Sequence, residues 1–87
     1  MDYLVIDVRS SNEYATGHVD SAINVPLEKI ADYKLDNKDQ LIVVYCASGA
    51  RSAMAKKILE AKGIKKVVNG VNAEQTRHLL KDGPENL

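Results

Sequence analysis

Short apolar runs alternate along the chain with segments in which apolar residues recur at helical spacing. Leu41 to Tyr45 is the strongest run, and five consecutive apolar residues are typical of a parallel strand with both faces covered. Ala50 to Lys62 has the helical pattern, and Gly63 is expected to end that helix. The other expected strands are Leu4–Ile6, a brief one within Val19–Val25, and Ile64–Val68, and the other expected helices are Ser10–Thr16, Leu27–Asp32 and Ala73–Lys81. This alternation predicts an α/β sandwich with a mainly parallel central sheet, flanked by helices and joined by right-handed crossovers.

Residues at the expected helix ends support these boundaries. Ser10 followed three residues later by Glu13 is a capping-box pattern, in which two otherwise unpaired backbone N–H groups are satisfied. Asn72 and Gln75 are suited to cap the last helix, which Gly83-Pro84 would close. Pro26 suits the first turn of the helix that follows it. Within the long helix, the residues expected to face inward are Met54, Ala55, Ile58 and Leu59.

The length and charge of the chain narrow its class. Eighty-seven residues leave no room for a second core, so residues 1–87 are expected to form one domain. Hydrophobic residues make up 45% and charged residues 28%, which fits a folded globule rather than a disordered chain. Twelve basic residues offset twelve acidic ones, which argues against nucleic acid or an anionic membrane as a partner. The longest apolar run, Leu41–Ala47, is far shorter than the ~20 residues of a membrane span.

Cysteine and histidine are scarce. A single cysteine, Cys46, excludes an internal disulfide, a four-cysteine zinc site and a Cys-x-x-Cys redox pair. The two histidines lie far apart in sequence, so neither a metal nor a cofactor is expected. The segment Met1-Asp2-Tyr3 has no basic or long apolar region, so no signal peptide is visible. As written the sequence predicts a cytoplasmic protein, and a periplasmic one if a leader has been removed.

The segment after the strongest strand combines the features of an anion-binding active site. Cys46 follows Tyr45, where ligands bind in open α/β sheets, and the small residues after it allow the backbone to curl. Gly49 can adopt dihedral angles that are closed to other residues. Such a curl turns several N–H groups toward one point at a helix N-terminus. The candidate binding residues are Ala47, Ser48, Gly49, Ala50, Arg51 and Ser52.

The same loop predicts an activated thiol. N–H groups and the nearby cation Arg51 should lower the pKa of Cys46, and the thiolate is the nucleophilic form. A lone cysteine after a buried strand is more often a small hydrophobic residue. The spacing of Gly49, Arg51 and Ser52 behind Cys46 favours the functional interpretation.

Motifs spread along the chain resemble those of the rhodanese-like domain family. Cys46 to Ser52 fits the family's C-x-x-G-x-R-S loop, and the resemblance extends from about Leu4 to Leu80. Among family members the chain looks most like the small single-domain proteins of the phage shock protein E type. The N-terminal signature of the family is matched in order by Asp7-Val8-Arg9, Glu13-Tyr14, Gly17-His18-Val19 and Ala22-Ile23-Asn24-Val25-Pro26.

The resemblance implies a rhodanese-like three-layer sandwich and sulfurtransferase chemistry. Cys46 would take the outer sulfur of thiosulfate, or of another small anionic donor, as a persulfide. A thiol or cyanide acceptor, or a carrier protein, would then remove it. Residues 47–52 would bind the donor. Backbone N–H groups and Arg51 are suited to stabilise its charge.

Two alternatives remain from other classes. The first is a non-catalytic persulfide carrier or redox-sensing module, which would also need Cys46. The second is a phosphatase or arsenate reductase; family comparison disfavours it because cysteine phosphatases have five residues between Cys and Arg, whereas four separate Cys46 from Arg51. Where the family often has a Gly-Gly pair followed by Trp, this chain has Asn69-Gly70-Val71-Asn72, which affects substrate range more than the nucleophile.

Other polar residues are expected to be structural. Asp7 and Arg9, at a strand end, should form a satisfied ion pair or bond to loop backbone. His18 is expected to tie loops together rather than act as a base for Cys46. A run of lysines beside the site in sequence is interpreted as a solvated face that could also steer anionic donors: Lys56, Lys57, Lys62, Lys65 and Lys66.

Overall fold

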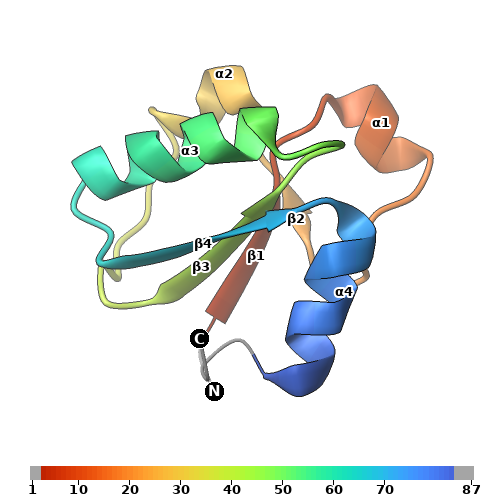
Figure 1. The fold of residues 1–87 in the computed structure, drawn as a ribbon. Coiled ribbons are helices and arrows are strands. Elements are labelled where there is room, and N and C mark those ends of the chain that lie inside the picture. Colours follow the sequence, from red (N-terminus) through yellow and green to blue (C-terminus); the bar gives the residue numbers. More distant parts are fainter. Residues whose placement is uncertain (1–2, 84–87) are drawn as a thin grey trace.

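A computed structural model describes residues 3–83 of the chain. Strands and helices alternate through this part of the chain (Figure 1). The elements are β1 (Tyr3–Asp7), α1 (Ser11–Ala15), β2 (Ile23–Asn24), α2 (Leu27–Ile30), β3 (Leu41–Tyr45), α3 (Ala50–Ala61), β4 (Lys66–Val71) and α4 (Ala73–Asp82).

The strands form one sheet in the order β2-β1-β3-β4, and every pair is parallel. Helices α2 and α3 cover one face of the sheet and α4 lies against the other, while α1 lies beyond the carboxyl ends of the strands (Figure 1). The predicted α/β sandwich with a parallel central sheet is therefore confirmed.

Strand β3 is the centre of the core. All five of its residues are buried, as the uninterrupted apolar run predicts. Successive side chains point to opposite faces, so Val44 packs with Leu59 of α3, and Val43 belongs with Leu79 of α4 to the cluster on the other face. A strand anchored on both faces gives the loop after it a fixed origin.

The predicted helix caps are present. The Ser10 side chain accepts a hydrogen bond from Glu13 N, and the Glu13 carboxylate accepts one from Ser10 N, which completes the capping box of α1. Asn72 caps α4 by accepting from Gln75 N at 2.8 Å. Pro26 precedes α2 as its cap, one position before the first turn. The expected closing residue Pro84 lies outside the described residues.

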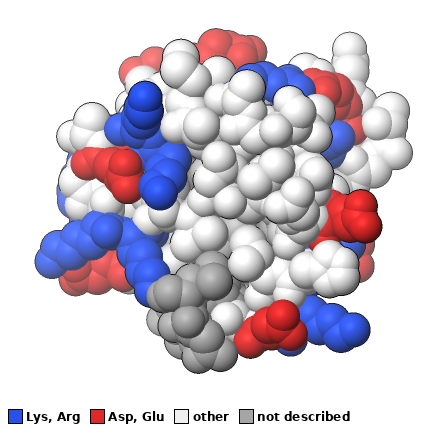
Figure 2. Space-filling model, viewed as in Figure 1, with Lys and Arg blue, Asp and Glu red and all other residues white. Residues whose placement is uncertain are grey.

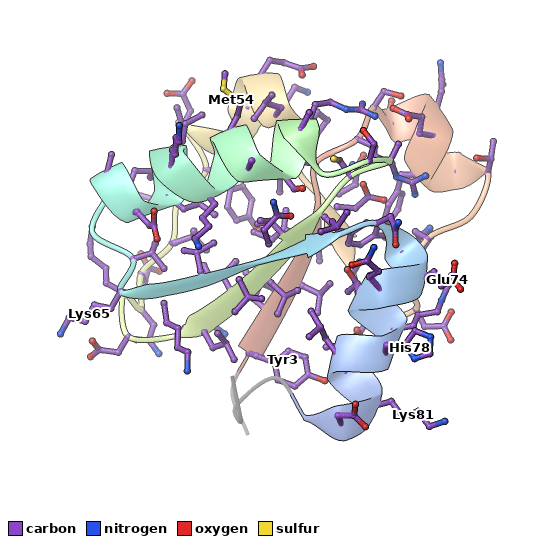
Figure 3. The ribbon with its side chains drawn as sticks, in the orientation of Figure 1. Tyr3, Met54, Lys65, Glu74, His78 and Lys81 are labelled. Atoms are coloured by element: carbon purple, nitrogen blue, oxygen red, sulfur yellow. The ribbon has the colours of Figure 1, made fainter. Side chains whose placement is uncertain are left out.

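Two expectations about side chains and strand bounds are wrong. Met54 is 57% exposed on the outer side of α3 (Figure 3), because the buried stripe of that helix runs through Ser52, Ala55 and Leu59. Met54 follows Ser52 by two residues, which turns its side chain about 200° around the helix axis and places it away from that stripe. Strand β4 is displaced toward its carboxyl end compared with the expected Ile64–Val68.

Candidate active site

Cys46 begins the loop between β3 and α3, at the carboxyl edge of the sheet. Its backbone N–H donates to the carbonyl oxygen of Val71 at 3.2 Å, which ties the loop to the end of β4. Gly49 caps α3 with φ of 101°, in the left-handed region that favours glycine. The curl predicted from the small residues is therefore present, and Cys46 is 2% exposed at its base.

The sulfur of Cys46 lies among hydrogen-bond donors. Gly49 N donates to Sγ at 3.0 Å and Ser52 N at 3.4 Å, and Ser52 Oγ lies 3.4 Å from the sulfur. Burial raises the pKa of the thiol, but the hydrogen bonds from the Ser52 hydroxyl and from the backbone N–H groups of Ser52, Ser48 and Gly49 outweigh it and lower the pKa to about 7. An appreciable fraction of Cys46 is therefore thiolate near neutral pH.

Close packing against β4 keeps the loop tight. A Cβ atom at Gly49 would lie 3.1 Å from Cγ1 of Val71, closer than carbon atoms normally approach. Val71 itself has φ of 73°, an uncommon conformation for a β-branched residue. A register shift in the β3–β4 ladder, at Val44 and Tyr45, brings this part of β4 to the loop. The end of β4 is thus one wall of the candidate site.

Arg51 faces Glu13 of α1. Its guanidinium makes two parallel hydrogen bonds to that carboxylate, at 2.7 and 3.0 Å. The hydrogen bond to Arg51, followed by the one from Ser10 N, lowers the pKa of Glu13 to about 2. Arg51 interacts electrostatically with Cys46, as predicted, but the Ser52 hydroxyl and the backbone N–H groups supply the largest favourable interactions with the thiolate. The Arg51 guanidinium is hydrogen-bonded to the Glu13 carboxylate, which is 38 residues away in sequence.

Asn69 of β4 is a site residue that the sequence analysis did not single out. Its Oδ1 atom accepts from Ser52 Oγ at 2.7 Å and from Val71 N at 2.9 Å, and its Nδ2 atom donates to Gly49 O at 3.4 Å. One amide thus joins β4 to the loop and to the first turn of α3. The only signal in the sequence was the departure from the family pattern at this point.

The remaining loop residues define the open side of the site. Ala47, Ser48 and Ala50 are exposed, whereas Gly49 and Arg51 are partly buried. A donor molecule would therefore approach Cys46 over residues 47–50, and the loop backbone lies on that path.

The ion pair expected between Asp7 and Arg9 and the structural contacts expected of His18 are both present. Asp7 is fully buried and accepts from Arg9, whose NH2 group also donates to Gly17 O at 2.7 Å. His18 stacks on the Tyr14 ring at a centroid distance of 3.6 Å, and its Nδ1 atom lies 2.8 Å from Tyr14 O. These contacts hold α1 and the segment after it beside the loop.

The lysine run is not gathered at the site. Lys65 lies where β4 begins, at the opposite end of the sheet from the loop, and it pairs with Asp39 at 3.0 Å (Figure 3). Figure 2 shows uncharged side chains over the middle of the face in view. Donor steering by the whole run is therefore not supported by its position.

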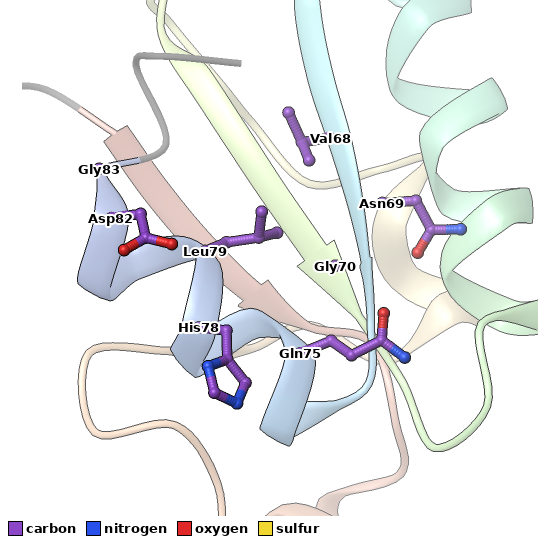
Figure 4. A pocket seen from close by; sticks show the side chains of 8 residues that line it. All are labelled: Val68, Asn69, Gly70, Gln75, His78, Leu79, Asp82 and Gly83. Atoms are coloured by element: carbon purple, nitrogen blue, oxygen red, sulfur yellow. The ribbon is translucent and has the colours of Figure 1, made fainter.

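A separate hollow of about 540 Å³ lies between β4 and α4. Figure 4 shows His78, Leu79 and Gln75 on its α4 side, with Val68 on β4. Neither Cys46 nor residues 47–52 line it, so we place the candidate chemistry at the loop. In residues 3–83 we find no cluster of side chains suited to a metal, and no helix there has the length and apolar character of a membrane span.

Comparison with known proteins identifies the loop's context. The family model of the rhodanese-like domain matches residues 1–72. The thiosulfate sulfurtransferase PspE of Escherichia coli (strain K12) is 37% identical, with 74% of this chain and 64% of that protein covered. A solved structure described as rhodanese with anions from E. coli superposes with a TM-score of 0.79 at 33% identity, covering 84% of this chain and 89% of that one.

Other relatives carry different names. A tRNA uridine(34) hydroxylase of Photorhabdus laumondii is 36% identical, covering 94% of this chain and 26% of that protein. The putative sulfur carrier protein YrkF of Bacillus subtilis (strain 168) is 37% identical, covering 77% of this chain and 37% of that protein. The chain thus spans from about a quarter to just under two thirds of the length of these curated relatives.

Proposed function

Because the chain belongs to the rhodanese-like domain family, whose chemistry is sulfur transfer, we propose that residues 1–87 form one such domain and that it moves a sulfane sulfur from thiosulfate to a thiophilic acceptor through a persulfide on Cys46. The observation that carries this proposal is the thiol itself. Its sulfur receives hydrogen bonds from Gly49 N and Ser52 N at the start of α3, and its pKa is about 7.

The first step loads the thiol. The Cys46 thiolate attacks the outer sulfur of thiosulfate, so a bond forms between the two sulfur atoms. The bond from the outer sulfur to the sulfonate sulfur breaks, and sulfite leaves with its electron pair. Because the attacking atom is negatively charged, N–H groups already directed at Sγ maintain the thiolate without a separate base.

The second step unloads it. A nucleophilic acceptor, such as cyanide or a thiolate, attacks the outer sulfur of the persulfide. The bond between the two sulfur atoms breaks, and Cys46 leaves as a thiolate. The Gly49 and Ser52 N–H groups stabilise that leaving group, because they are aimed at the position where the charge reappears.

The loop has a second role as the anion-binding surface. The exposed residues Ala47, Ser48 and Ala50 lie along the approach to Cys46, and α3 points its N-terminus there. Arg51 stands at the same edge, held by Glu13, and contributes positive charge. The sulfonate end of the donor would lie against these groups, with its outer sulfur directed inward.

A persulfide carrier is the second candidate, favoured by the relative named as a putative sulfur carrier. A carrier would accept sulfur from a partner protein and would release it slowly to small acceptors. Steady-state turnover with thiosulfate and cyanide separates the two functions. We expect wild type to form thiocyanate and sulfite in equal amounts and Cys46→Ser to form neither.

The same assay can overturn the proposal. A folded Cys46→Ser protein with substantial turnover would remove the thiol from the reaction. A wild-type protein that takes sulfur only from another persulfide, with no thiosulfate turnover, would establish the carrier. Efficient cleavage of an aryl phosphate without thiosulfate turnover would establish the phosphatase alternative in its place.

A further inference from the structure

The hydroxyl group of Ser52 has one proton and three polar neighbours. Its Oγ atom lies 2.7 Å from Asn69 Oδ1, 3.2 Å from Gly49 O and 3.4 Å from Cys46 Sγ. Both oxygens accept hydrogen bonds and cannot donate them, so each competes with the sulfur for the same proton. Ser52 is fully buried, which keeps water from supplying an alternative partner.

The orientation of the Asn69 amide decides this competition. Val71 N donates to Oδ1 at 2.9 Å, so the oxygen, not the NH2 group, must lie on that side. The same oxygen is the atom 2.7 Å from Ser52 Oγ. With the flip fixed by a backbone N–H, Asn69 can only accept from Ser52. Figure 4 shows its side chain leaving β4 toward α3.

The state of the sulfur must then change the direction of the hydroxyl. While Ser52 donates to Asn69, its oxygen presents a lone pair to Cys46 and can accept the thiol S–H. A thiolate has no proton to give and repels that lone pair. For Ser52 to stabilise the thiolate, the hydroxyl must rotate to Sγ and release Asn69 Oδ1, which keeps only its bond from Val71 N.

We propose that Asn69 is a positioning residue that sets the direction of the Ser52 hydroxyl, away from the sulfur when Cys46 is a thiol and toward it only when Cys46 is a thiolate. The inference rests on the proposed function, because the thiol concerned is the nucleophile assigned there. Its consequence is that Asn69 opposes ionisation of Cys46, while the backbone N–H groups favour it. The amide thereby keeps Cys46 more basic, and a more basic thiolate is the stronger nucleophile.

Charged groups around the loop form a constant background. Arg51 of α3 pairs with Glu13 of α1, and Arg9 pairs with Asp7 at the end of β1. From β4 the neutral residue Asn69 faces the first turn of α3. Substitutions at positions 52 and 69 replace no charged group, so a change in titration reports on the hydrogen bonds.

The test is a double-mutant cycle on the Cys46 pKa, read from the pH dependence of alkylation by iodoacetamide. Because alkylation requires no sulfur transfer, this inference and the proposed function can fail separately. With Ser52 present, Asn69→Ala should lower the alkylation midpoint by about 0.5 to 1 pKa unit more than the same substitution does in the Ser52→Ala background. The reason is that loss of the amide leaves the Ser52 hydroxyl free to donate to the thiolate. Equal effects in both backgrounds, or a coupling of opposite sign, would overturn the inference.

A second measurement needs no substitution at position 69. Cys46 is the only cysteine, so its S–H stretching band in the infrared spectrum stands alone. Below the thiol midpoint, the wild-type band should have the lowered frequency of a thiol that donates a hydrogen bond. In Ser52→Ala it should move to the frequency of a weaker or absent donation. A wild-type band at the frequency of a non-bonded thiol would contradict the geometry proposed for Ser52.

Discussion

Gly49→Ala should raise the pKa of Cys46, which should make its thiol react more slowly near neutral pH and faster at high pH. The added Cβ meets Val71 Cγ1 at 3.1 Å, and φ of 101° costs a residue with a side chain about 1–2 kcal/mol. The loop must therefore relax away from β4. This relaxation should first weaken the 3.0 Å hydrogen bond from Gly49 N to Cys46 Sγ.

The size of the effect follows from that one bond. A hydrogen bond to a charged group contributes about 1.5–3 kcal/mol, so losing most of one moves the pKa from about 7 to roughly 8. At pH 7 the thiolate fraction falls about fivefold. A more basic thiolate is intrinsically about threefold more nucleophilic for a Brønsted slope of about 0.4–0.5. The variant should thus react about twofold more slowly at pH 7 and about 2.5-fold faster at pH 9, with the two profiles crossing at about pH 7.6.

Alkylation of the single cysteine by iodoacetamide, followed by intact mass across a pH series, measures both profiles. Thermal unfolding of the two proteins confirms that the variant is folded, and Cys46→Ser gives the background. A variant profile that coincides with wild type would show that Gly49 N does not hold the thiolate. A profile below wild type at every pH would show that the loop blocks access to the sulfur, and the pKa argument would be refuted.

Three further changes test the surroundings of the loop. Gly70→Ala should destabilise the protein by about 1–3 kcal/mol in denaturant unfolding, because its Cβ would clash with Thr76 Oγ1. Adding Thr76→Ala should recover part of the loss, and an unchanged midpoint in Gly70→Ala would contradict the close packing. The pKa of Glu13 is lowered in the folded protein, so its pair with Arg51 adds stability above about pH 4.5 that disappears as the pH falls through about 2. Glu13→Gln should remove this part of the acid-unfolding profile, and identical profiles for the two proteins would show that the pair contributes nothing. Val71→Gly should raise the thermal midpoint by a few degrees, because relief of about 1–2 kcal/mol of strain at its positive φ exceeds the backbone entropy cost of glycine, about 0.5–1 kcal/mol. A lower midpoint would mean that the packing of the Val71 side chain outweighs the strain.

Local patterns made most of the fold predictable. The capping box of α1 and the buried run of β3 are properties of neighbouring residues, and both appear where the sequence places them. The bounds of β4 were missed because Asn69 and Gly70 are residue types depleted in strands. Pairing with β3 and the register shift near Val44 carry the strand through them, and such pairing is a long-range effect.

The nucleophile and its loop were predictable from the sequence, but the long-range side-chain hydrogen bonds around them were not. Position after a buried strand and small following residues indicated the curled loop around Cys46. The partner of Arg51 is 38 residues away in sequence, so nothing local marks Glu13 as its acceptor. Asn69 was missed for the same reason, because its link to Ser52 exists only once β4 lies beside α3.

The central claim is that Cys46 takes one sulfur atom from thiosulfate, and intact mass spectrometry tests it most directly. The protein is reduced, freed of reductant, treated with thiosulfate and measured without further chemistry, then measured again after cyanide. We expect wild type to gain the mass of one sulfur atom and to lose it with cyanide, while Cys46→Ser stays unchanged throughout. A folded wild-type protein that gains no sulfur, or an equal gain in Cys46→Ser, would contradict the account.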